Sequence, residues 1–459
     1  LPGGGNPRTE TTLARLDPRP RHRLRAGMSG SQAASAGQPD RALSREERRT
    51  LAVLSLPTLG FALTITTVTT YLPVVVSEFT GSTTAIGLLI GAEGILALFL
   101  PIVVGARSDR LATRLGGRLP FVLAGVPVMA LALVLLGFVG GFVAATVVVL
   151  VFFAAYFLAY EPYRALYPDL VEEDAAGRGQ SAQAVARGIG TGLALLGGGL
   201  LLAIGQPVPF IAAATLLMLA TGVFVHTLLR RDGVPRYGSA GTTRAREALS
   251  ALRTMVREQR PLRDYLVANA LWEAALGAIK TFVVLFVTVG VGLSLAGAAG
   301  VIGAAAVFVL LGAATAGKLA DRFGRERVMR IAVTVYGVPL VVPFLTQEPE
   351  FVLPLMPVIA TGAGVVMALP YALLIPMMPD SEHGLLTGFY SMSRGLGVVL
   401  GPILAGVAIE ISRALGAPFG TDGYSVMWLV AGALLVASVP LLGRMGRGSG
   451  TGGERSSSA

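Results

Sequence analysis

The feature that most constrains this chain is a series of twelve apolar runs, each long enough to cross a lipid bilayer. A helix rises about 1.5 Å per residue, so about 20 apolar residues cross a hydrocarbon core of about 30 Å. Backbone polar groups in lipid must be satisfied within their own segment, so each run is predicted to be a helix. The runs lie at about residues 51–76, 84–104, 120–140, 143–165, 184–204, 207–229, 264–290, 295–316, 328–346, 351–378, 385–411 and 424–443.

The composition excludes most other classes of protein. Of the 459 residues, 53% are hydrophobic and 14% are charged, whereas a soluble domain carries about 25% charged residues. The chain has no cysteine, and its three histidines are scattered at His22, His226 and His383. No catalytic or phosphate-binding motif is found. We therefore expect an all-α membrane protein that is not an enzyme and that has no metal or cofactor.

Basic residues alternate between successive connections. Nearly all loop lysines and arginines fall in the N-terminus, 105–119, 166–183, 230–263, 317–327, 379–384 and the C-terminus, whereas the other connections contain only Arg413. By the positive-inside rule the first set faces the cytoplasm. We therefore expect a multi-pass protein of the plasma membrane with both termini inside. The net charge of +10 is a topology signal, and no nucleic-acid partner is expected.

The pattern divides the chain into five regions. We expect a disordered basic N-terminal region (1–49), a six-helix half (50–229), a cytoplasmic linker (230–263), a second six-helix half (264–443) and a disordered C-terminal tail (444–459). Residues 1–27 are rich in proline and arginine, and they either are disordered or lie upstream of a true start at Met28.

Three sequence echoes indicate an internal repeat. The charged segment "GARSDRLATRLGGRLPF" (105–121) resembles "GKLADRFGRER" (317–327), with Asp109 and Asp321 separated by 212 residues (321 − 109). "PYRALYPD" (162–169) resembles "PYALLIPMMPD" (370–380) at an offset of 208, and "ARGIG" (186–190) resembles "SRGLG" (393–397) at an offset of 207. Collinear echoes predict two six-helix halves in parallel orientation around a midplane site, which is a transporter architecture.

The two charged segments, which we call the cassettes, resemble a known family. The second cassette matches the major facilitator superfamily signature G-x-x-x-D-R-x-G-R-x-R through Gly317, Asp321, Arg322, Gly324, Arg325 and Arg327. The first resembles the loop of the sucrose-transporter and glycoside–cation symporter branch through Asp109, Arg110, Arg114, Gly116, Arg118, Pro120 and Phe121, and "PYRALYPDL" resembles that branch's fourth span. Gly117 and Leu119 depart from the branch pattern, where two basic residues are expected. The resemblance implies the major facilitator fold and a monomeric, proton-coupled sugar symporter.

The resemblance also implies that the cassettes act as a latch between the halves on the cytoplasmic side. Arg187 and Arg394 open spans 5 and 11 at matching positions of the repeat. We expect crossed pairings, with the Asp109 cassette against the start of span 11 and the Asp321 cassette against the start of span 5. The alternative is that these arginines are topology anchors. The latch residues are Asp109, Arg110, Arg114, Arg118, Asp321, Arg322, Arg325, Arg187 and Arg394.

Charged residues at membrane depth mark the candidate site, because an ionised side chain there costs several kcal/mol unless it is paired or wet. Glu93 lies near the middle of span 2, and we interpret it either as a proton carrier or as a permanently protonated hydrogen-bond partner. In span 7, Glu273 and Lys280 share one helical face with Asn269, and Glu273 is the next candidate for proton coupling. These residues are predicted to face a solute cavity.

Three further features are assigned with an alternative each. The ring of Trp272 either stacks on a sugar or packs in the core. Tyr71 and the threonines of span 1 line the pathway, or the threonines instead bond within their own helix. Glu161 and Arg164 either pair with each other or interact with Arg187.

The sequence therefore predicts a secondary transporter that moves a small polar solute, most similar to proton-coupled sugar symporters. The expected partners are the solute, protons or another cation, and the lipid bilayer. An exporter of amphiphilic compounds on the same scaffold is the alternative, and a membrane sensor that binds without transport is a third possibility.

Overall fold

The structure is a computed structural model that describes residues 45–111, 113–170, 176–230, 259–377, 383–417 and 419–449. Contacts divide the chain into two units, residues 1–50 and 51–459. The described part of the first unit is the start of a helix, and the second unit contains the helical bundle. In the described ranges, twelve helical segments are long and apolar enough to cross a membrane. The predicted set of twelve spans is confirmed.

The first half of the bundle consists of six long helices. Their bounds are α2 (Arg45–Ser77), α3 (Thr83–Arg110), α4 (Leu119–Leu136), α5 (Phe142–Leu170), α6 (Ala176–Ile204) and α7 (Pro207–Leu229). Local sequence sets where they start: the Ser82 side chain caps α3 by accepting from the Ala85 N–H, and α4 and α7 begin with proline in the first turn, where a missing N–H is harmless.

The second half repeats this plan with more breaks. Its spans are α9 (Arg260–Leu285) with η2 (Phe286–Gly290); α10 (Leu295–Phe323); α11 (Arg325–Gly337) with η3 (Val338–Leu340) and α12 (Val341–Leu345); α13 (Pro349–Ala368); α15 (His383–Ala414); and α16 (Val426–Ser449). Short helices α14 (Pro370–Leu374) and η4 (Ile375–Met377) follow α13, and η5 (Thr421–Gly423) precedes α16. Proline at 339 and 343 accounts for the break in the ninth span, because proline cannot donate to the helical ladder.

The two halves repeat each other down to single hydrogen bonds. In the first half, the Arg118 guanidinium donates to the Ala165 carbonyl. In the second half, Arg325 Nη1 donates to the Ala372 carbonyl over 3.0 Å. Both donors and both acceptors are separated by 207 residues (325 − 118 and 372 − 165), which matches the offset of the sequence echoes. The fold is therefore two six-helix parallel repeats.

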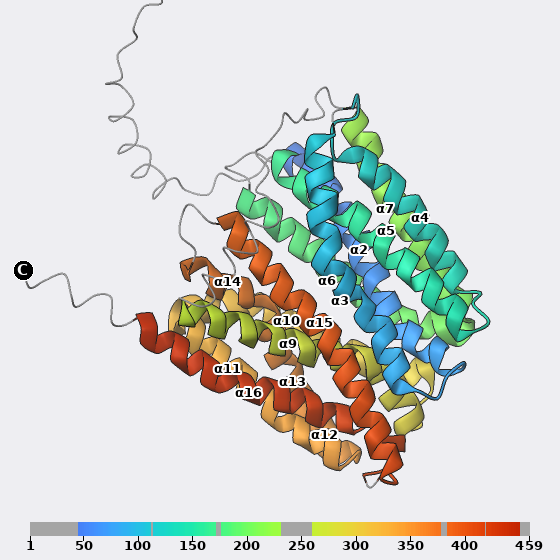
Figure 1. Ribbon diagram of the computed structural model, residues 1–459, viewed down its shortest axis with the longest axis vertical. Helices are drawn as coiled ribbons and strands as arrows, with labels where there is room; N and C mark the ends of the chain where they lie inside the picture. Colours follow the sequence, from blue (N-terminus) through green and yellow to red (C-terminus); the bar gives the residue numbers. More distant parts are fainter. Residues whose placement is uncertain are drawn as a thin grey trace, which may run out of the picture. The chain divides into compact units, whose positions relative to one another are not determined.

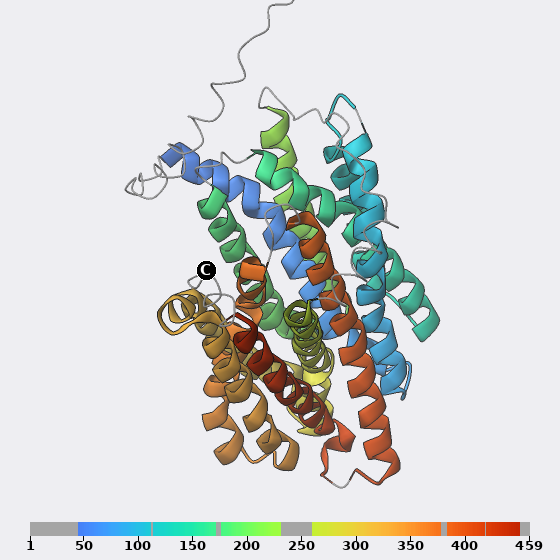
Figure 2. The ribbon, with the colours of Figure 1, turned by 60° about the vertical axis from the view of Figure 1, so that its left-hand side comes forward.

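The halves contact each other through two helix pairs, α3 with α15 and α6 with α10. Figures 1 and 2 both show α3, in blue, running alongside α15, in orange. Glycines allow these backbones to approach closely: Gly406 lies against Thr83, Gly94 against Gly395, and Gly199 against Leu295.

Two ends of the bundle are distinguished by their connections. The short-loop end contains residues 78–82, 137–141, 205–206, 291–294, 346–348 and 415–425, and the basic-loop end contains the two cassettes. Residue 83 begins α3, and residue 406 lies near the end of α15, so their contact lies close to the short-loop end. The contact of Gly94 with Gly395 lies near mid-span. The close contacts between α3 and α15 thus occupy the half of the bundle nearer the short-loop end.

Three helices extend beyond the apolar runs into the regions predicted as linker and termini. α9 begins at Arg260, within the predicted linker of 230–263; α16 continues to Ser449, within the predicted tail of 444–459; and α2 already begins at Arg45. The physical reason is that hydropathy marks where the apolar core ends, whereas polar residues continue a helix beyond it. The expectations for residues 1–44, 231–258 and 450–459 lie outside the described residues.

Candidate functional site

Four charged side chains from three helices meet near the middle of the bundle. They are Glu93 on α3, Glu273 and Lys280 on α9, and Arg394 on α15, and their charges act on one another. Glu93 and Lys280 belong to opposite halves, so this central charge cluster lies where the halves meet. The sequence predicted each of these four residues, but it assigned Arg394 to the latch.

Glycines on α15 explain why these residues meet. A Cβ added to Gly94 of α3 would lie 2.5 Å from the Gly395 carbonyl oxygen, and one added to Gly397 would overlap the Ala270 carbonyl oxygen of α9. Only glycine permits backbones to approach this closely. Gly395 therefore faces α3, while Gly397 faces α9. Helix α15 thus lies against both helices and brings Glu93 of α3 close to Glu273 of α9.

Two members of the cluster form an ion pair. Arg394 Nε lies 3.3 Å from Glu273 Oε1, and the side chains are 50% and 19% exposed, respectively. Glu93 and Lys280 are also partly exposed. Within the described ranges, neither Glu93 nor Lys280 makes a hydrogen bond or ion pair. The cluster thus combines one ion pair with two partly exposed charges that make no hydrogen bond or ion pair among the described residues.

An aromatic wall on α2 and α5 borders the cluster. The rings of Tyr156 and Tyr160 stack with centroids 5.0 Å apart, and Phe61 contacts both rings edge-on. Tyr156 interacts electrostatically with Glu93, and the Tyr160 hydroxyl accepts a hydrogen bond of 3.2 Å from Arg187 Nη2. Sequence reasoning missed both tyrosines, although their spacing of four residues beside Glu161 was a signal that could have identified them.

Three predicted binding residues are buried in packing contacts instead of facing accessible space. Tyr71 is 1% exposed and donates to the Leu195 carbonyl over 2.6 Å. Asn269 is fully buried, and its Nδ2 donates to Ser393 Oγ over 2.8 Å. In this structure, Tyr71 and Asn269 therefore do not face accessible space, and their place on the solute pathway stays a prediction.

Trp272 has the contacts expected from the packing alternative. It is 1% exposed, and its indole N–H donates to Ser438 Oγ of α16 over 2.8 Å. Successive helical residues point about 100° apart, so a helix that presents Glu273 to α15 directs Trp272 towards α16. The ring therefore belongs to the core of the second half.

Glu161 and Arg164, the two charged residues near the end of span 4, contact each other, as the first of their two alternatives predicts. Arg164 Nη1 lies 4.0 Å from Glu161 Oε1, three residues earlier on α5. Because Arg187 contacts the Tyr160 hydroxyl, it is not the described partner of Glu161.

The cassettes make contacts within their own halves. Arg118 bonds to the Ala165 carbonyl of α5 and Arg325 to the Ala372 carbonyl of α14, and Arg322 lies over the Phe323 ring at 5.2 Å. Asp321 is exposed, and it makes no hydrogen bond or ion pair among the described residues. Arg110 and Arg114 are exposed, and the side chain of Asp109 lies outside the description.

Among the described side chains, which do not include Asp109, the expected crossed pairings of Arg187 and Arg394 are not found. Arg394 pairs with Glu273, and Arg187 contacts Tyr160, so each keeps its described partner within its own half. The close contacts between α3 and α15 lie towards the short-loop end, away from the cassettes. The latch therefore stays a prediction about another conformation.

At the short-loop end, polar contacts join the halves directly. Ser82 Oγ donates to Glu410 Oε1 over 2.5 Å, Thr84 Oγ1 donates to Glu410 Oε2 over 2.6 Å, and the Thr84 N–H donates to Oε1 over 3.2 Å. Arg413 Nη1 donates to the Gly81 carbonyl over 3.1 Å. We call the three bonds to Glu410 the Glu410 clamp. Sequence reasoning missed it, because an acid at the end of an apolar span resembles an ordinary surface residue.

Comparisons with known proteins identify the family. The sequence family described as the Major Facilitator Superfamily matches residues 15–195, 54–315 and 300–457, and no curated protein sequence matches the chain. A bacterial homologue of the human lysosomal transporter Spinster, in an inward-facing and unoccupied conformation, aligns with TM-score 0.69 and 16% identity, over 88% of this chain and 98% of that one.

Two further solved structures share the fold. The nucleoside transporter NupG aligns with TM-score 0.67 and 17% identity, over 86% of this chain and 98% of that one. A bacterial homologue of the iron transporter ferroportin, in an inward-facing state, aligns with TM-score 0.63 and 14% identity, over 86% of this chain and 98% of that one. The family match, with twelve spans arranged as two parallel repeats, establishes that the chain belongs to the major facilitator superfamily of membrane transporters.

Proposed function

We propose that this secondary transporter carries a small polar solute, with sugars as the first class to test, across the plasma membrane in exchange for or together with protons. The observation that carries the proposal is the central charge cluster. Four charges at membrane depth are expensive, and here they are partly exposed and lie where the two halves meet. A site at the interface of the repeats is where a transporter of this architecture binds its solute.

The chemistry of the site suits a solute rich in hydroxyl groups. Carboxylates accept hydrogen bonds, whereas the Lys280 ammonium and the Arg394 guanidinium donate them. With Trp272 and Tyr156 both buried, the ring that would stack against a sugar is that of Tyr160, which is partly exposed. The resemblance of the first cassette and of "PYRALYPDL" to the sucrose and glycoside symporter branch supports the same class.

Proton coupling is assigned to Glu93. With Glu93 and Glu273 ionised and Lys280 and Arg394 charged, the cluster has no net charge. Protonation of Glu93 leaves it with one net positive charge, so solute binding and protonation at this site affect each other. Glu273 is the weaker candidate, because its carboxylate is held by Arg394 at 3.3 Å.

We infer that the short-loop end faces the outside and is closed in this structure, with both termini in the cytoplasm. Arginine-rich connections at the opposite end support this orientation through the positive-inside rule. The Glu410 clamp and the Gly81–Arg413 contact join the halves at the short-loop end. In this arrangement the central charge cluster exchanges with the cytoplasm.

A second candidate function is proton-driven export of amphiphilic compounds. The observation that favours it is the aromatic wall of Phe61, Tyr156 and Tyr160, whose partly exposed ring, Tyr160, suits a solute with an apolar body. The paired charges of the cluster favour the polar solute instead.

The test is transport by the purified protein in vesicles, with and without an imposed proton gradient. The vesicles would be offered a panel of labelled sugars and, separately, a fluorescent amphiphilic cation. Accumulation of a sugar that requires the gradient and collapses with a protonophore is the expected result. Gradient-driven movement of the amphiphile without any sugar uptake would establish the second candidate, and movement of neither would refute both the sugar assignment and the second candidate.

A further inference from the structure

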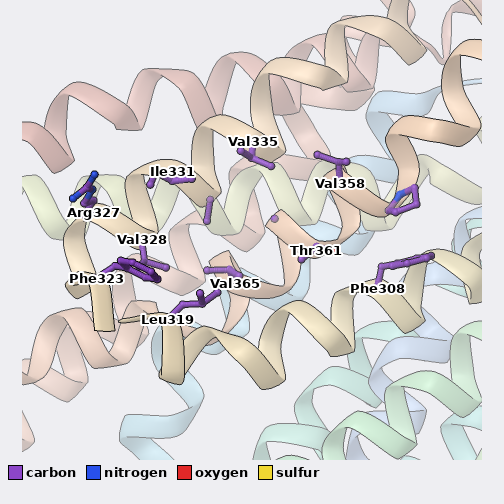
Figure 3. Close-up of a pocket in the computed structure, with 13 residues that line it drawn as sticks. Phe308, Leu319, Phe323, Arg327, Val328, Ile331, Val335, Val358, Thr361 and Val365 are labelled. Atoms are coloured by element: carbon purple, nitrogen blue, oxygen red, sulfur yellow. The ribbon is translucent and has the colours of Figure 1, made fainter. Parts of the chain in front are cut away.

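A groove of about 680 Å³ lies in the second half between α10, α11 and α13 (Figure 3). Its walls are apolar, and several of the side chains in them are exposed although they are large: Leu319, Ile331 and Val358 are 37%, 54% and 43% exposed. Exposed apolar side chains on transmembrane helices face lipid. Among the described residues that line the groove, Arg327 is the only charged one, and it lies at one end of the groove in Figure 3.

The groove extends from the basic-loop end to the middle of the membrane. Arg327 lies in the first turn of α11, and Val335 lies eight residues further along the same helix, about 12 Å away at about 1.5 Å per residue. On α10, Phe308 lies near the middle of a helix that ends at Phe323. One leaflet occupies half of a hydrocarbon core of about 30 Å. The groove therefore matches the depth of a single leaflet.

Glycines create this groove by fixing α13 against its two neighbours. A Cβ on Gly312 of α10 would overlap the Thr361 carbonyl of α13, and one on Gly362 of α13 would meet Tyr336 of α11 at 3.0 Å. The chain passes from α10 to α11 through Gly324, whose φ of +86° is readily adopted by glycine. α13 therefore forms the floor, while α10 and α11 form the two walls.

We propose that this groove binds one acyl chain of an anionic phospholipid whose phosphate is held by Arg327. The guanidinium is exposed, and in the described part of the chain it has no hydrogen bond or ion pair. It lies where an apolar groove reaches the basic-loop end, which is where a lipid headgroup would lie. Arginine binds phosphate through two parallel N–H···O bonds, and basic pockets between transmembrane helices bind anionic headgroups.

The site belongs to the second half alone. At the offset of 207 residues that relates the halves, Arg327 corresponds to Pro120 (327 − 120), so the first half has no cation at the equivalent position. The neighbouring acid, Glu326, does not line the groove. The lipid would join α10 to α11 at the second cassette, where it would add a contact to a connection that consists of Gly324 alone.

The experiment uses the absence of cysteine from the chain. A fluorophore is attached to Val358→Cys, at the midplane end of the groove, in the full-length protein reconstituted in phosphatidylcholine vesicles. Part of the lipid is then replaced by phosphatidylglycerol or phosphatidylcholine with brominated acyl chains, at equal mole fraction. Bromine quenches fluorescence at short range, so quenching reports which lipid occupies the groove.

We expect several-fold stronger quenching by the brominated phosphatidylglycerol than by the brominated phosphatidylcholine. Arg327→Gln should abolish this preference, whereas Arg330→Gln, which removes an exposed charge from the same helix outside the groove, should retain it. Val335→Phe should reduce quenching by both lipids, because it fills the groove from an exposed position. Equal quenching by the two lipids in the parent protein, or a preference that survives Arg327→Gln, would refute the proposal.

Discussion

Glu93 and Glu273 are two carboxylates in one cluster with different surroundings. Glu273 is bound to Arg394, whereas Glu93 has no hydrogen-bond or ion-pair partner among the described residues. A carboxylate without a fixed partner can gain and lose a proton without breaking a contact. The difference between the two sites therefore predicts different consequences for the same substitution.

Glu93→Gln should abolish accumulation of solute against a gradient and preserve exchange at equilibrium. Glutamine mimics the protonated carboxyl, so solute can still bind and cross, but proton release, which accumulation requires, cannot occur. Glu273→Gln serves as the matched comparison. It leaves the exposed Arg394 guanidinium unpaired, so exchange and accumulation should both fall.

Both activities are measured with labelled solute in the same vesicles. Retained accumulation in the Glu93→Gln protein would remove Glu93 from proton coupling. A loss of exchange equal to that of Glu273→Gln would give it a binding role instead.

Among individual residues, the sequence predicted the charged members of the site and not the aromatic ones. Glu93, Glu273 and Lys280 were identified because a charge at membrane depth is costly wherever it points. Trp272 and Tyr71 are buried against neighbouring helices, and an aromatic residue on a membrane helix does not indicate from sequence whether its face contacts another helix or a cavity. The contacts that decide this, with Ser438 and Leu195, come from distant parts of the sequence.

Among the helices, the pairing of α3 with α15 depends on glycines that the apolar pattern does not distinguish. The bounds of the spans were predicted from hydropathy, but hydropathy does not indicate which helices lie side by side. Gly94 and Gly105 illustrate the difference, because both lie in α3. A Cβ at Gly94 would lie 2.5 Å from the Gly395 carbonyl oxygen and 2.8 Å from the Val399 nitrogen, whereas one at Gly105 would meet nothing within 4 Å.

Gly94→Ala should therefore destabilise the protein, whereas Gly105→Ala should not. Backbone atoms of α15 cannot move aside as a flexible side chain would, and overpacking of this kind costs about 1–3 kcal/mol. An alanine at an open helical position gains about 0.5–1 kcal/mol over glycine. The midpoint of thermal unfolding in detergent should fall for the first variant and stay or rise for the second. Equal midpoints would show that α3 and α15 do not pack this closely in solution.

For the whole molecule, the repeat was predictable and the conformation was not. Echoes at offsets of 207–212 residues gave the two halves, and the bonds of Arg118 and Arg325 confirm that relation. A transporter sequence must encode at least two arrangements of its halves, so residues that join them in one state are separated in another. Asp321 is exposed in a structure whose halves are joined at the other end, and its place in a latch stays a prediction about another arrangement.

The Glu410 clamp predicts how the ratio of molecules closed and open at the short-loop end can be changed. Glu410 accepts bonds from the Ser82 and Thr84 hydroxyls and from the Thr84 N–H across the interface of the halves. Hydrogen bonds to a charged group are worth about 1.5–3 kcal/mol each when buried. Because Glu410 is partly exposed, we expect the clamp as a whole to stabilise closure by about 1–3 kcal/mol, or roughly 5- to 150-fold in the ratio of closed to open molecules.

Glu410→Ala should open the short-loop end. The measurement is the distance distribution between spin labels on Gly140→Cys, in the first half, and Leu415→Cys, in the second, both of which lie at that end outside the clamp. The variant should gain a population at longer distance, because alanine offers nothing to Ser82 and Thr84. Glu350→Ala removes an exposed acid from the same end without breaking a described contact, and it should leave the distribution unchanged. A Glu410→Ala distribution that matches the parent would show that the packing of α3 on α15 closes this end without the clamp.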